Sequence, residues 1–298
     1  MELSSEHLRT MAAVVDHGTF ERAAAVLHIT PSAVSQRMKA LEQRAGRVLV
    51  KRTKPIVATS SGQALLRLAR QLALLESEAS ALLDSGGDGA DGASASGRAT
   101  VSLVVNADSL ATWALPALAS VEGVSFDVVL DDQEHTLDRL RDGTAMAAIT
   151  SDSEAVQGCT VTPLGSMRYR AVASPSFVRR HADGGWTATA MVTAPMLVFD
   201  RKDALQDRYL QERAPGAHPP RHYVPASTEF VRAAVLGLGW GMLPDLQSAP
   251  FVDDGRLVLL DPEHVLDVPL FWQQWSLRSS TLAAVGEALR EAAQRSLR

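Results

Sequence analysis

The stretch HITPSAVSQRMKALEQRAG, residues 28–46, has the pattern of a helix with one apolar side. Val34, Met38 and Leu41 are spaced four and three residues apart, so they share one face of a helix. Thr30 or Ser32 can cap its start, and Pro31 suits the first turn. The opposite face carries polar and basic side chains: Ser32, Ser35, Gln36, Arg37 and Lys39. An ordinary solvated helix face has the same composition, so its role depends on the flanking segments.

The segment before this stretch predicts two further helices. Apolar residues recur with a helical period over residues 4–17, and Gly18 suits the C-terminal cap. Thr19 can then cap a second helix that contains residues 22–27. Two helices joined by a tight turn form a helix-turn-helix, in which the second helix can lie in the DNA major groove. Ser and Gln side chains can hydrogen-bond base edges there, while Lys and Arg reach phosphates or guanine.

Two features follow the helix-turn-helix. Residues 48–62 alternate like a short hairpin, and its tip carries Lys51, Arg52 and Lys54, as expected for a wing that touches the DNA backbone. Leucines then recur at spacings of three and four, which is a heptad stripe on a helix over residues 59–83. We expect this stripe to pair with a second chain, because it is narrower than a core-facing surface. The expected pairing residues are Leu65, Leu68, Leu72, Leu75 and Leu82.

Residues 3–83 resemble the N-terminal domain of LysR-type transcriptional regulators, in the order helix, FERAAAVLHITPSAVSQRMKALEQRAG, basic wing and leucine-rich helix. The resemblance implies an N-terminal winged helix-turn-helix at 1–58, a dimerisation helix at 59–83 and a dimer or tetramer. The segment matching Pro31, Ser32, Ser35 and Gln36 would meet bases, and the wing would meet the backbone. The complete set of candidate DNA-binding residues is Thr30, Pro31, Ser32, Ser35, Gln36, Arg37, Lys39, Lys51, Arg52 and Lys54.

The charge distribution agrees with a DNA-binding front end. Net charge is −5 overall, but residues 1–83 hold 11 Lys and Arg against 7 Asp and Glu, whereas residues 84–298 hold 18 against 27. A basic segment followed by an acidic remainder suggests a polyanionic partner for the first part only. The Gly-, Ser- and Asp-rich residues 84–98 between them are expected to form a flexible hinge.

The remainder alternates strands and helices. Apolar runs at 100–105, 125–132 and 145–150 are separated by helical patterns, which predicts a βαβαβ unit and an α/β domain over 99–298. This part resembles the effector domain of the same regulators, which looks like a periplasmic binding protein. The resemblance implies two α/β lobes around a cleft, lobe I at 99–165 and 265–298 and lobe II at 166–264.

A candidate ligand site follows the first strand of this domain. In NADSLATW, residues 106–113, either Asp108 or Ser109 can cap a helix whose free N–H groups suit a ligand carboxylate. A plain N-cap explains the same spacing. The stretch resembles the subfamily of these regulators that senses lysine and arginine and controls basic amino-acid export, and a dicationic ligand would need acids around it. The candidate effector-binding residues are Asn106, Asp108, Ser109, Asp132, Glu134, Thr150, Asp200, Thr228 and Glu229.

Other classes of protein fit the sequence less well. We find no nucleophile elbow, phosphate loop or metal-spaced histidine pair, so we expect no enzyme, no metal and no cofactor beyond the amino-acid effector. We find neither a signal peptide nor a membrane-spanning run, which predicts a cytoplasmic, nucleoid-associated protein that binds double-stranded DNA and works with RNA polymerase. The alternative is a ligand-independent DNA-binding protein, such as an inhibitor of replication initiation, with weak sequence preference.

Overall fold

The computed structural model describes residues 3–85, 99–130 and 136–298. Its N-terminal domain contains three helices, α1 (Ser5–His17), α2 (Phe20–Val26) and α3 (Pro31–Ala45). Gly18 caps α1 in the left-handed conformation at φ 70°, and the Thr19 and Thr30 hydroxyls accept the backbone N–H groups of Arg22 and Ala33. The expected helix-turn-helix is therefore confirmed, with Thr30 rather than Ser32 at the cap of α3.

A short hairpin follows α3. Its strands β1 (Val50–Lys51) and β2 (Val57–Ala58) pair antiparallel, as the alternation predicts. The Ile56 N–H donates to the Gly18 carbonyl at 2.9 Å, so the hairpin is tied to the end of α1. A Cβ at Gly62 would lie 2.0 Å from the Leu49 carbonyl oxygen, so only glycine permits this close approach of the hairpin to the next helix.

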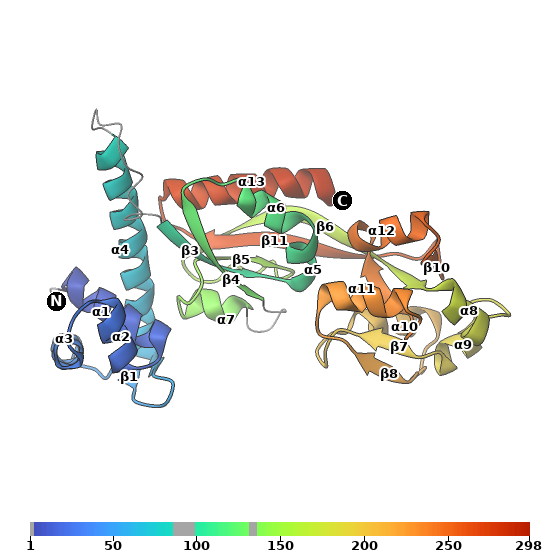
Figure 1. The fold of residues 1–298 in the computed structure, drawn as a ribbon, viewed down its shortest axis with the longest axis horizontal. Helices are drawn as coiled ribbons and strands as arrows, with labels where there is room; N and C mark the ends of the chain where they lie inside the picture. Colours follow the sequence, from blue (N-terminus) through green and yellow to red (C-terminus); the bar gives the residue numbers. More distant parts are fainter. Residues whose placement is uncertain (1–2, 86–98, 131–135) are drawn as a thin grey trace.

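The next helix, α4 (Ser60–Ser85), rises away from the helix-turn-helix (Figure 1). Its first half packs against α1 of the same chain: Leu66 and Ala69 are buried in the N-terminal core. Leu65, Leu68 and Leu72 are half-buried against that core, whereas Leu75 and Leu82 are exposed. The N-terminal part of the leucine stripe therefore covers the chain's own core, and its C-terminal part is left for the expected partner helix.

The C-terminal part is built on a seven-stranded sheet with the order β10-β6-β11-β5-β3-β4, and β9 pairs with β6. The parallel order β4-β3-β5 confirms the expected βαβαβ unit. A separate parallel pair is formed by β7 and β8. The strands are β3 (Ala99–Val105), β4 (Val124–Leu130), β5 (Ala147–Thr150), β6 (Cys159–Ala173), β7 (Met196–Val198), β8 (Arg221–Tyr223), β9 (Gly241–Pro244), β10 (Val258–Leu259) and β11 (Leu266–Trp275).

Helices cover both ends of this sheet. After β3, helical backbone runs without a break through α5 (Ala107–Ser109), a π-helical turn (Leu110–Ala114) and α6 (Leu115–Ala119). The other helices are α7 (Thr136–Arg141), α8 (Pro175–His181), α9 (Ala188–Thr193), α10 (Leu205–Arg213), α11 (Ser227–Val235), α12 (Asp245–Asp253) and α13 (Ser280–Ser296). The pattern of residues 169–174 predicts only the last part of β6, and α8, α9, α10 and α12 were not predicted.

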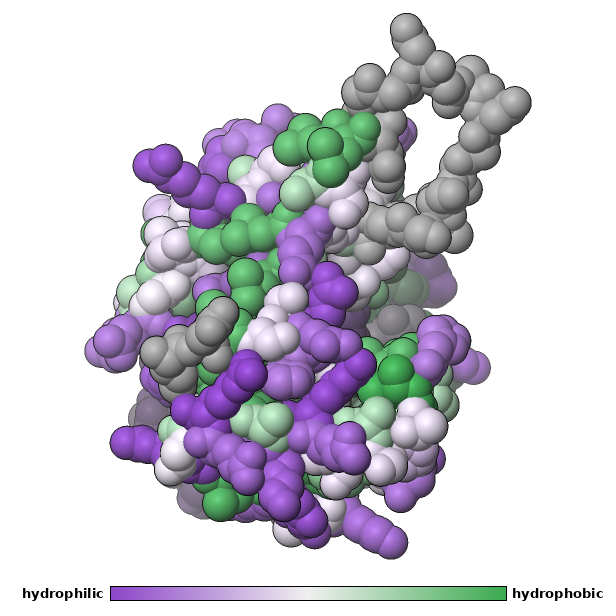
Figure 2. Space-filling view, turned by 90° about the vertical axis from the view of Figure 1, so that its left-hand side faces the viewer, coloured by the Kyte–Doolittle hydropathy of each residue, from purple (hydrophilic) through white to green (hydrophobic). Residues whose placement is uncertain are grey.

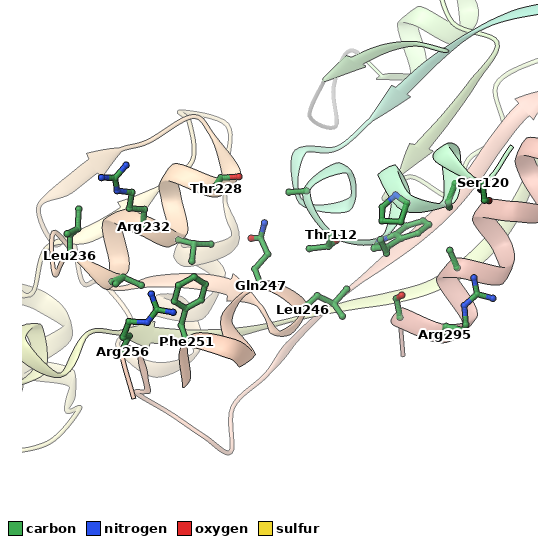
Figure 3. A pocket seen from close by; sticks show the side chains of 18 residues that line it. Thr112, Ser120, Thr228, Arg232, Leu236, Leu246, Gln247, Phe251, Arg256 and Arg295 are labelled. Atoms are coloured by element: carbon green, nitrogen blue, oxygen red, sulfur yellow. Dashed lines mark hydrogen bonds between the residues drawn. The ribbon is translucent and has the colours of Figure 1, made fainter. Parts of the chain in front are cut away.

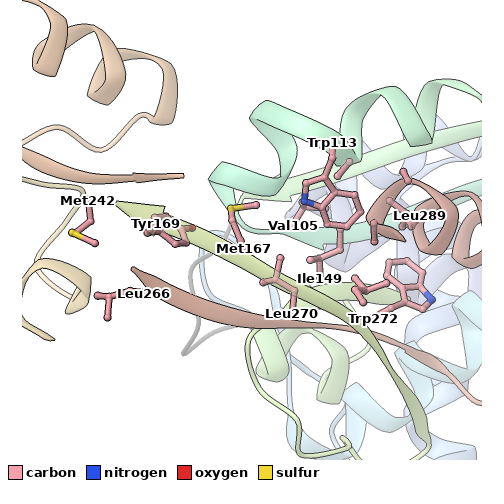
Figure 4. Close-up of a cluster of buried hydrophobic side chains, with 14 of the residues drawn as sticks. Val105, Trp113, Ile149, Met167, Tyr169, Met242, Leu266, Leu270, Trp272 and Leu289 are labelled. Carbon is pink, nitrogen blue, oxygen red and sulfur yellow. The ribbon is translucent and has the colours of Figure 1, made fainter. Parts of the chain in front are cut away.

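Two lobes are visible in Figure 1, joined by the long antiparallel strands β6 and β11. Lobe I contains β3, β4, β5, α5 to α7 and α13; lobe II contains β7 to β10 and α8 to α12. A buried apolar cluster runs along β6 and β11 from one lobe to the other (Figure 4). Trp113 and Trp272 belong to it in lobe I, and Met242 belongs to it in lobe II. This continuous core spans both lobes beside the cleft described below.

Candidate functional site

The outer face of α3 is free to meet a ligand. Val34, Met38 and Leu41 are buried at no more than 1% exposure, so the opposite side of the helix faces solvent. Six of the predicted DNA-binding side chains are exposed on or beside it: Thr30, Pro31, Ser32, Ser35, Gln36 and Lys39. Arg37 differs, because its guanidinium forms an ion pair with Glu6 of α1 and is only 25% exposed. The expectation that Arg37 faces outward is therefore wrong.

The wing adds a basic surface beside α3. Lys51, Arg52 and Lys54 are all exposed, and the Arg52 guanidinium lies 5.8 Å from the centre of the Phe20 ring. Figure 2 faces this end of the molecule and shows hydrophilic side chains over much of its lower part. A polar helix face next to a basic hairpin is an arrangement that can contact base edges and phosphates together.

A second surface at this end is apolar. Leu75, Leu82 and Leu83 of α4 are 37%, 76% and 79% exposed. Exposed large aliphatic side chains at helical spacing lose free energy to water unless another surface covers them. The C-terminal half of α4 is therefore a candidate contact surface for a second helix.

A cavity of about 420 Å³ lies between the two lobes. This volume is in the range of small-molecule sites. Asn106, Asp108, Thr150 and Asp200, four of the predicted effector-binding residues, line it from both sides. The ends of β3 and β5 supply the lobe I side, and the loop from β7 to α10 supplies most of the lobe II side.

Asp108 is the most constrained side chain of this cleft. The Tyr169 hydroxyl donates to its Oδ2 at 2.7 Å, and the Ser227 hydroxyl donates to its Oδ1 at 2.6 Å. Gln247 Nε2 in turn donates to the Ser227 hydroxyl oxygen at 2.8 Å. The sequence predicts Asp108 or Ser109 as the cap of this helix, but Asn106 occupies the cap position. The Asp108 carboxylate instead connects lobe I, strand β6 and lobe II.

Burial raises the pKa of Asp108 above the usual range for an aspartate, and the nearby negative charge of Asp203 raises it further. The hydrogen bonds from Ser227 and Tyr169 act in the opposite direction but do not outweigh burial. A carboxylate has about four acceptor positions, of which these hydroxyls use two. A cation entering the cleft would therefore find acceptor positions and would relieve the cost of burying the negative charge.

The lobe II side of the cleft is organised by two further aspartates. Asp200 accepts the backbone N–H groups of Lys202 and Asp203 at 2.7 and 2.9 Å. Asp203 accepts those of Phe199 and Leu205 at 3.0 Å each, which fixes the start of α10. These bonds hold an acidic loop in one shape beside the cavity.

Several cleft residues were not predicted from the sequence. Tyr169 and Ser227 reach Asp108 from 61 and 119 residues further along the chain. Gln206 is 2% exposed, lines the cavity, and its Oε1 has no hydrogen-bond partner among the described residues. Asp203, three residues after the predicted Asp200, also lines the cavity but is not among the candidates from the sequence. The Asp-x-x-Asp spacing before a helical pattern is the one signal that points to it.

Not every predicted effector residue reaches the cleft. Ser109 is fully buried behind the first turn, and its hydroxyl has no partner among the described residues. Thr228 and Glu229 are exposed on α11, because successive helical residues turn by about 100° and only Ser227 points inward. Thr228 lines a separate cavity of about 980 Å³ with Arg232, Phe251 and Arg295 (Figure 3). Asp132 and Glu134 lie outside the described residues.

Within residues 3–85, 99–130 and 136–298, no three His, Cys, Asp or Glu side chains gather in a way that could hold a metal ion. None of the helices in these ranges combines the length and apolar character needed to cross a bilayer.

A helix-turn-helix with a basic wing, joined in one chain to a two-lobed domain with a small-molecule cleft, defines a ligand-responsive DNA-binding protein. The family models agree: residues 5–63 match the bacterial regulatory helix-turn-helix protein of the lysR family, and residues 94–294 match the LysR substrate binding domain. The chain belongs to the LysR family of bacterial regulators.

Individual relatives are similar over the full length. The HTH-type transcriptional regulator LysG of Mycobacterium tuberculosis is 46% identical over 293 residues, which cover 98% of this chain and 94% of the relative. The crystal structure of ArgP from Mycobacterium tuberculosis superimposes with a TM-score of 0.85 at 45% identity, covering 100% and 99% of the two chains. Full-length LysG from Corynebacterium glutamicum with bound effector Arg gives 0.75 at 39% identity, covering 99% and 100%.

Proposed function

We propose that this protein is a transcriptional regulator that reads duplex DNA with α3 and the wing and senses a basic amino acid, lysine or arginine, in the interlobe cleft. The observation that carries the proposal is the buried Asp108 carboxylate on the cleft wall, in the same chain as an exposed helix-turn-helix. The Corynebacterium glutamicum relative with Arg as its bound effector supports the same ligand class.

The cleft chemistry suits an amino acid with an extra positive charge. Asp108, Asp200 and Asp203 supply negative charge on both sides of the cavity. Arg208 also lines it, and the first N–H groups of the helical segment after Asn106 have no partner within the helix. Asp108 would receive an ammonium or guanidinium group, and the basic groups would receive the ligand carboxylate.

The proposed DNA contacts divide by chemistry. Thr30, Pro31, Ser32, Ser35, Gln36 and Lys39 would lie along the major groove, and Lys51, Arg52 and Lys54 would contact phosphates. Arg37 is left out of this surface, since Glu6 holds it. The exposed leucines of α4 would pair two chains, so that two α3 helices face a two-fold DNA site.

The regulated gene would encode an amino-acid exporter, with RNA polymerase as the partner at the promoter. A Corynebacterium glutamicum relative that is 42% identical over 300 residues carries the name lysine export transcriptional regulatory protein, which supports this target.

Isothermal titration calorimetry of the purified chain with L-lysine, L-arginine, L-histidine and L-glutamate tests the ligand class. We expect saturable heat with lysine or arginine and none with glutamate, and we expect Asp108→Ala to abolish it. If none of the four amino acids gives a binding heat, the ligand part of the proposal fails and a ligand-independent DNA-binding protein is favoured.

A further inference from the structure

The cavity between the lobes is bordered by a buried amide that the chain itself leaves without a donor. Gln206, the second residue of α10, is 2% exposed and lines the cavity, and its Oε1 accepts no hydrogen bond from the described residues. Buried amides in folded proteins are normally hydrogen-bonded, because an unpaired buried acceptor costs free energy. The amide oxygen of Gln206 is therefore available to a donor that enters the cavity.

Asn106 repeats this feature on the lobe I side of the cavity. It occupies the N-cap of the helical segment after β3, where an asparagine side chain ordinarily accepts a backbone N–H of the first turn. The Asn106 side chain makes no such bond, and its Oδ1 is buried without a partner in the part of the chain that the structure describes. Two amide oxygens, one from each lobe, thus lack donors at the same cavity.

Asp108 adds charged acceptors to this set. Its two oxygens each receive one hydroxyl, from Ser227 and from Tyr169, and about two acceptor positions of the carboxylate remain. Asp203 lines the cavity on the lobe II side and adds a second negative charge near Asp108. The ligand group that satisfies these atoms must be cationic and must carry several N–H donors.

Arginine and lysine differ in how they can meet such acceptors. A guanidinium is a planar fork with five N–H donors on three nitrogens, whereas an ammonium carries its three donors on one nitrogen. The fork can donate to a carboxylate on one wall and to an amide oxygen on the other, while a compact ammonium that pairs with the carboxylate leaves the amide oxygen across the cavity unpaired.

The other end of the ligand has a separate partner. Arg208 lies two residues after Gln206, is exposed and also lines the cavity, so its positive charge suits the ligand carboxylate. The acceptors at Asp108, Asn106 and Gln206 are then left for the cationic side-chain end.

We infer that Gln206 determines the ligand specificity of the cleft by accepting an N–H of a guanidinium group, so that the protein binds arginine more tightly than lysine. This inference rests on the proposed function, since a basic amino acid must occupy the cavity. Because the Gln206 Oε1 has no partner within the described chain, the residue contributes to ligand binding and not to the stability of the ligand-free fold.

Gln206→Met is the substitution that tests this role. Methionine is unbranched and adaptable, so it can fill the same space without the amide oxygen. Gln211→Met is the matched control, because Gln211 belongs to the same helix but is exposed and does not line the cavity. In thermal melts without ligand, Gln206→Met should melt at the temperature of the unaltered protein or higher, since the change removes an unpaired buried polar group.

Isothermal titration calorimetry with L-arginine and L-lysine measures the specificity as the ratio of the two Kd values. A hydrogen bond to a charged group corresponds to roughly 10- to 150-fold in a binding constant. We expect the unaltered protein and Gln211→Met to prefer arginine by about tenfold or more. In Gln206→Met, the affinity for arginine should fall by at least about tenfold, and the affinity for lysine should stay within about threefold, so the preference is lost.

Three results would overturn the role of Gln206. The first is an unaltered protein that binds lysine as tightly as arginine, which needs no variant to observe. The second is an unchanged ratio of Kd values in Gln206→Met. The third is a Gln206→Met variant that melts at a lower temperature and loses both ligands equally, as expected of a structural residue. Binding of neither amino acid by the unaltered protein would instead overturn the proposed function, and this inference with it.

Discussion

Replacing Asp108 by asparagine removes one negative charge from the cleft and keeps the size of the side chain. The carbonyl oxygen of the introduced asparagine can still accept the Ser227 hydroxyl, and its amide can donate to the Tyr169 hydroxyl oxygen. The local geometry should therefore survive, and the change isolates the charge. We expect the variant to fold and to lose affinity for lysine and arginine.

The size of the loss follows from burial. Asp108 is buried in the cleft wall, where truncating one member of a hydrogen-bonded charge pair costs about 2–5 kcal/mol of binding free energy. A loss of about 2 kcal/mol corresponds to a Kd roughly 30-fold weaker, and larger losses would remove detectable binding.

Stability should change in the opposite direction. The folded-state pKa of Asp108 is raised, so the native state gains protons relative to the unfolded state, and this favourable contribution is lost as pH rises through the folded-state pKa. Asparagine mimics the protonated form. Without ligand at neutral pH, Asp108→Asn should melt at the same temperature as the native protein or higher, and the difference should shrink as pH falls.

Calorimetry with L-arginine and thermal melts measure both effects on the same samples. Asp127→Asn is the control, because Asp127 is exposed on β4 and does not line the cleft. A Kd for arginine within about threefold of the native value would refute the assignment of Asp108 as the cation partner, since 1.4 kcal/mol already corresponds to tenfold.

Three further substitutions test the DNA-binding end of the molecule. Lys54→Ala should weaken binding to all DNA sequences. It should also make the negative slope of log K against log salt shallower by about 0.9, measured by fluorescence anisotropy at several salt concentrations. Gln36→Ala should cost about 1–3 kcal/mol on the preferred sequence and little on random DNA, and equal losses on both would contradict a base contact. Leu82→Glu should shift the chain toward a smaller assembly in analytical ultracentrifugation, because it places a charge in the exposed apolar stripe of α4; an unchanged mass would show that this stripe is not the contact.

Local patterns were sufficient to predict the N-terminal domain. Its helices are short, periodic and capped by Gly18, Thr19 and Thr30, and each signal acts within a few residues. The parallel strands of lobe I were equally clear, since they are continuous apolar runs. By contrast, most of β6 was missed: Pro163 and Gly165 interrupt its pattern, yet β11 pairs with it on both sides of these residues.

The cleft shows more clearly which contacts cannot be predicted from the sequence. Asp108 could be singled out because it follows a strand at the start of a helix, but its partners Tyr169 and Ser227 are distant in sequence and meet it only through the crossing of β6 and the placement of α11. Helix geometry also separates Ser227 from Thr228, which the sequence pattern treats alike. Arg37 fails for a similar reason, since only the packing of α1 on α3 brings Glu6 to it.

One thermodynamic cycle tests whether the cleft and the DNA surface act together. Genomic fragments selected by the protein provide the DNA, and the Kd for DNA is measured with and without saturating L-arginine or L-lysine. The Kd for the amino acid is then measured on free and DNA-bound protein. A regulator that senses a basic amino acid must give the same factor in both directions, different from one. Identical amino-acid affinities with and without DNA would contradict the proposal that occupancy of the cleft controls DNA binding.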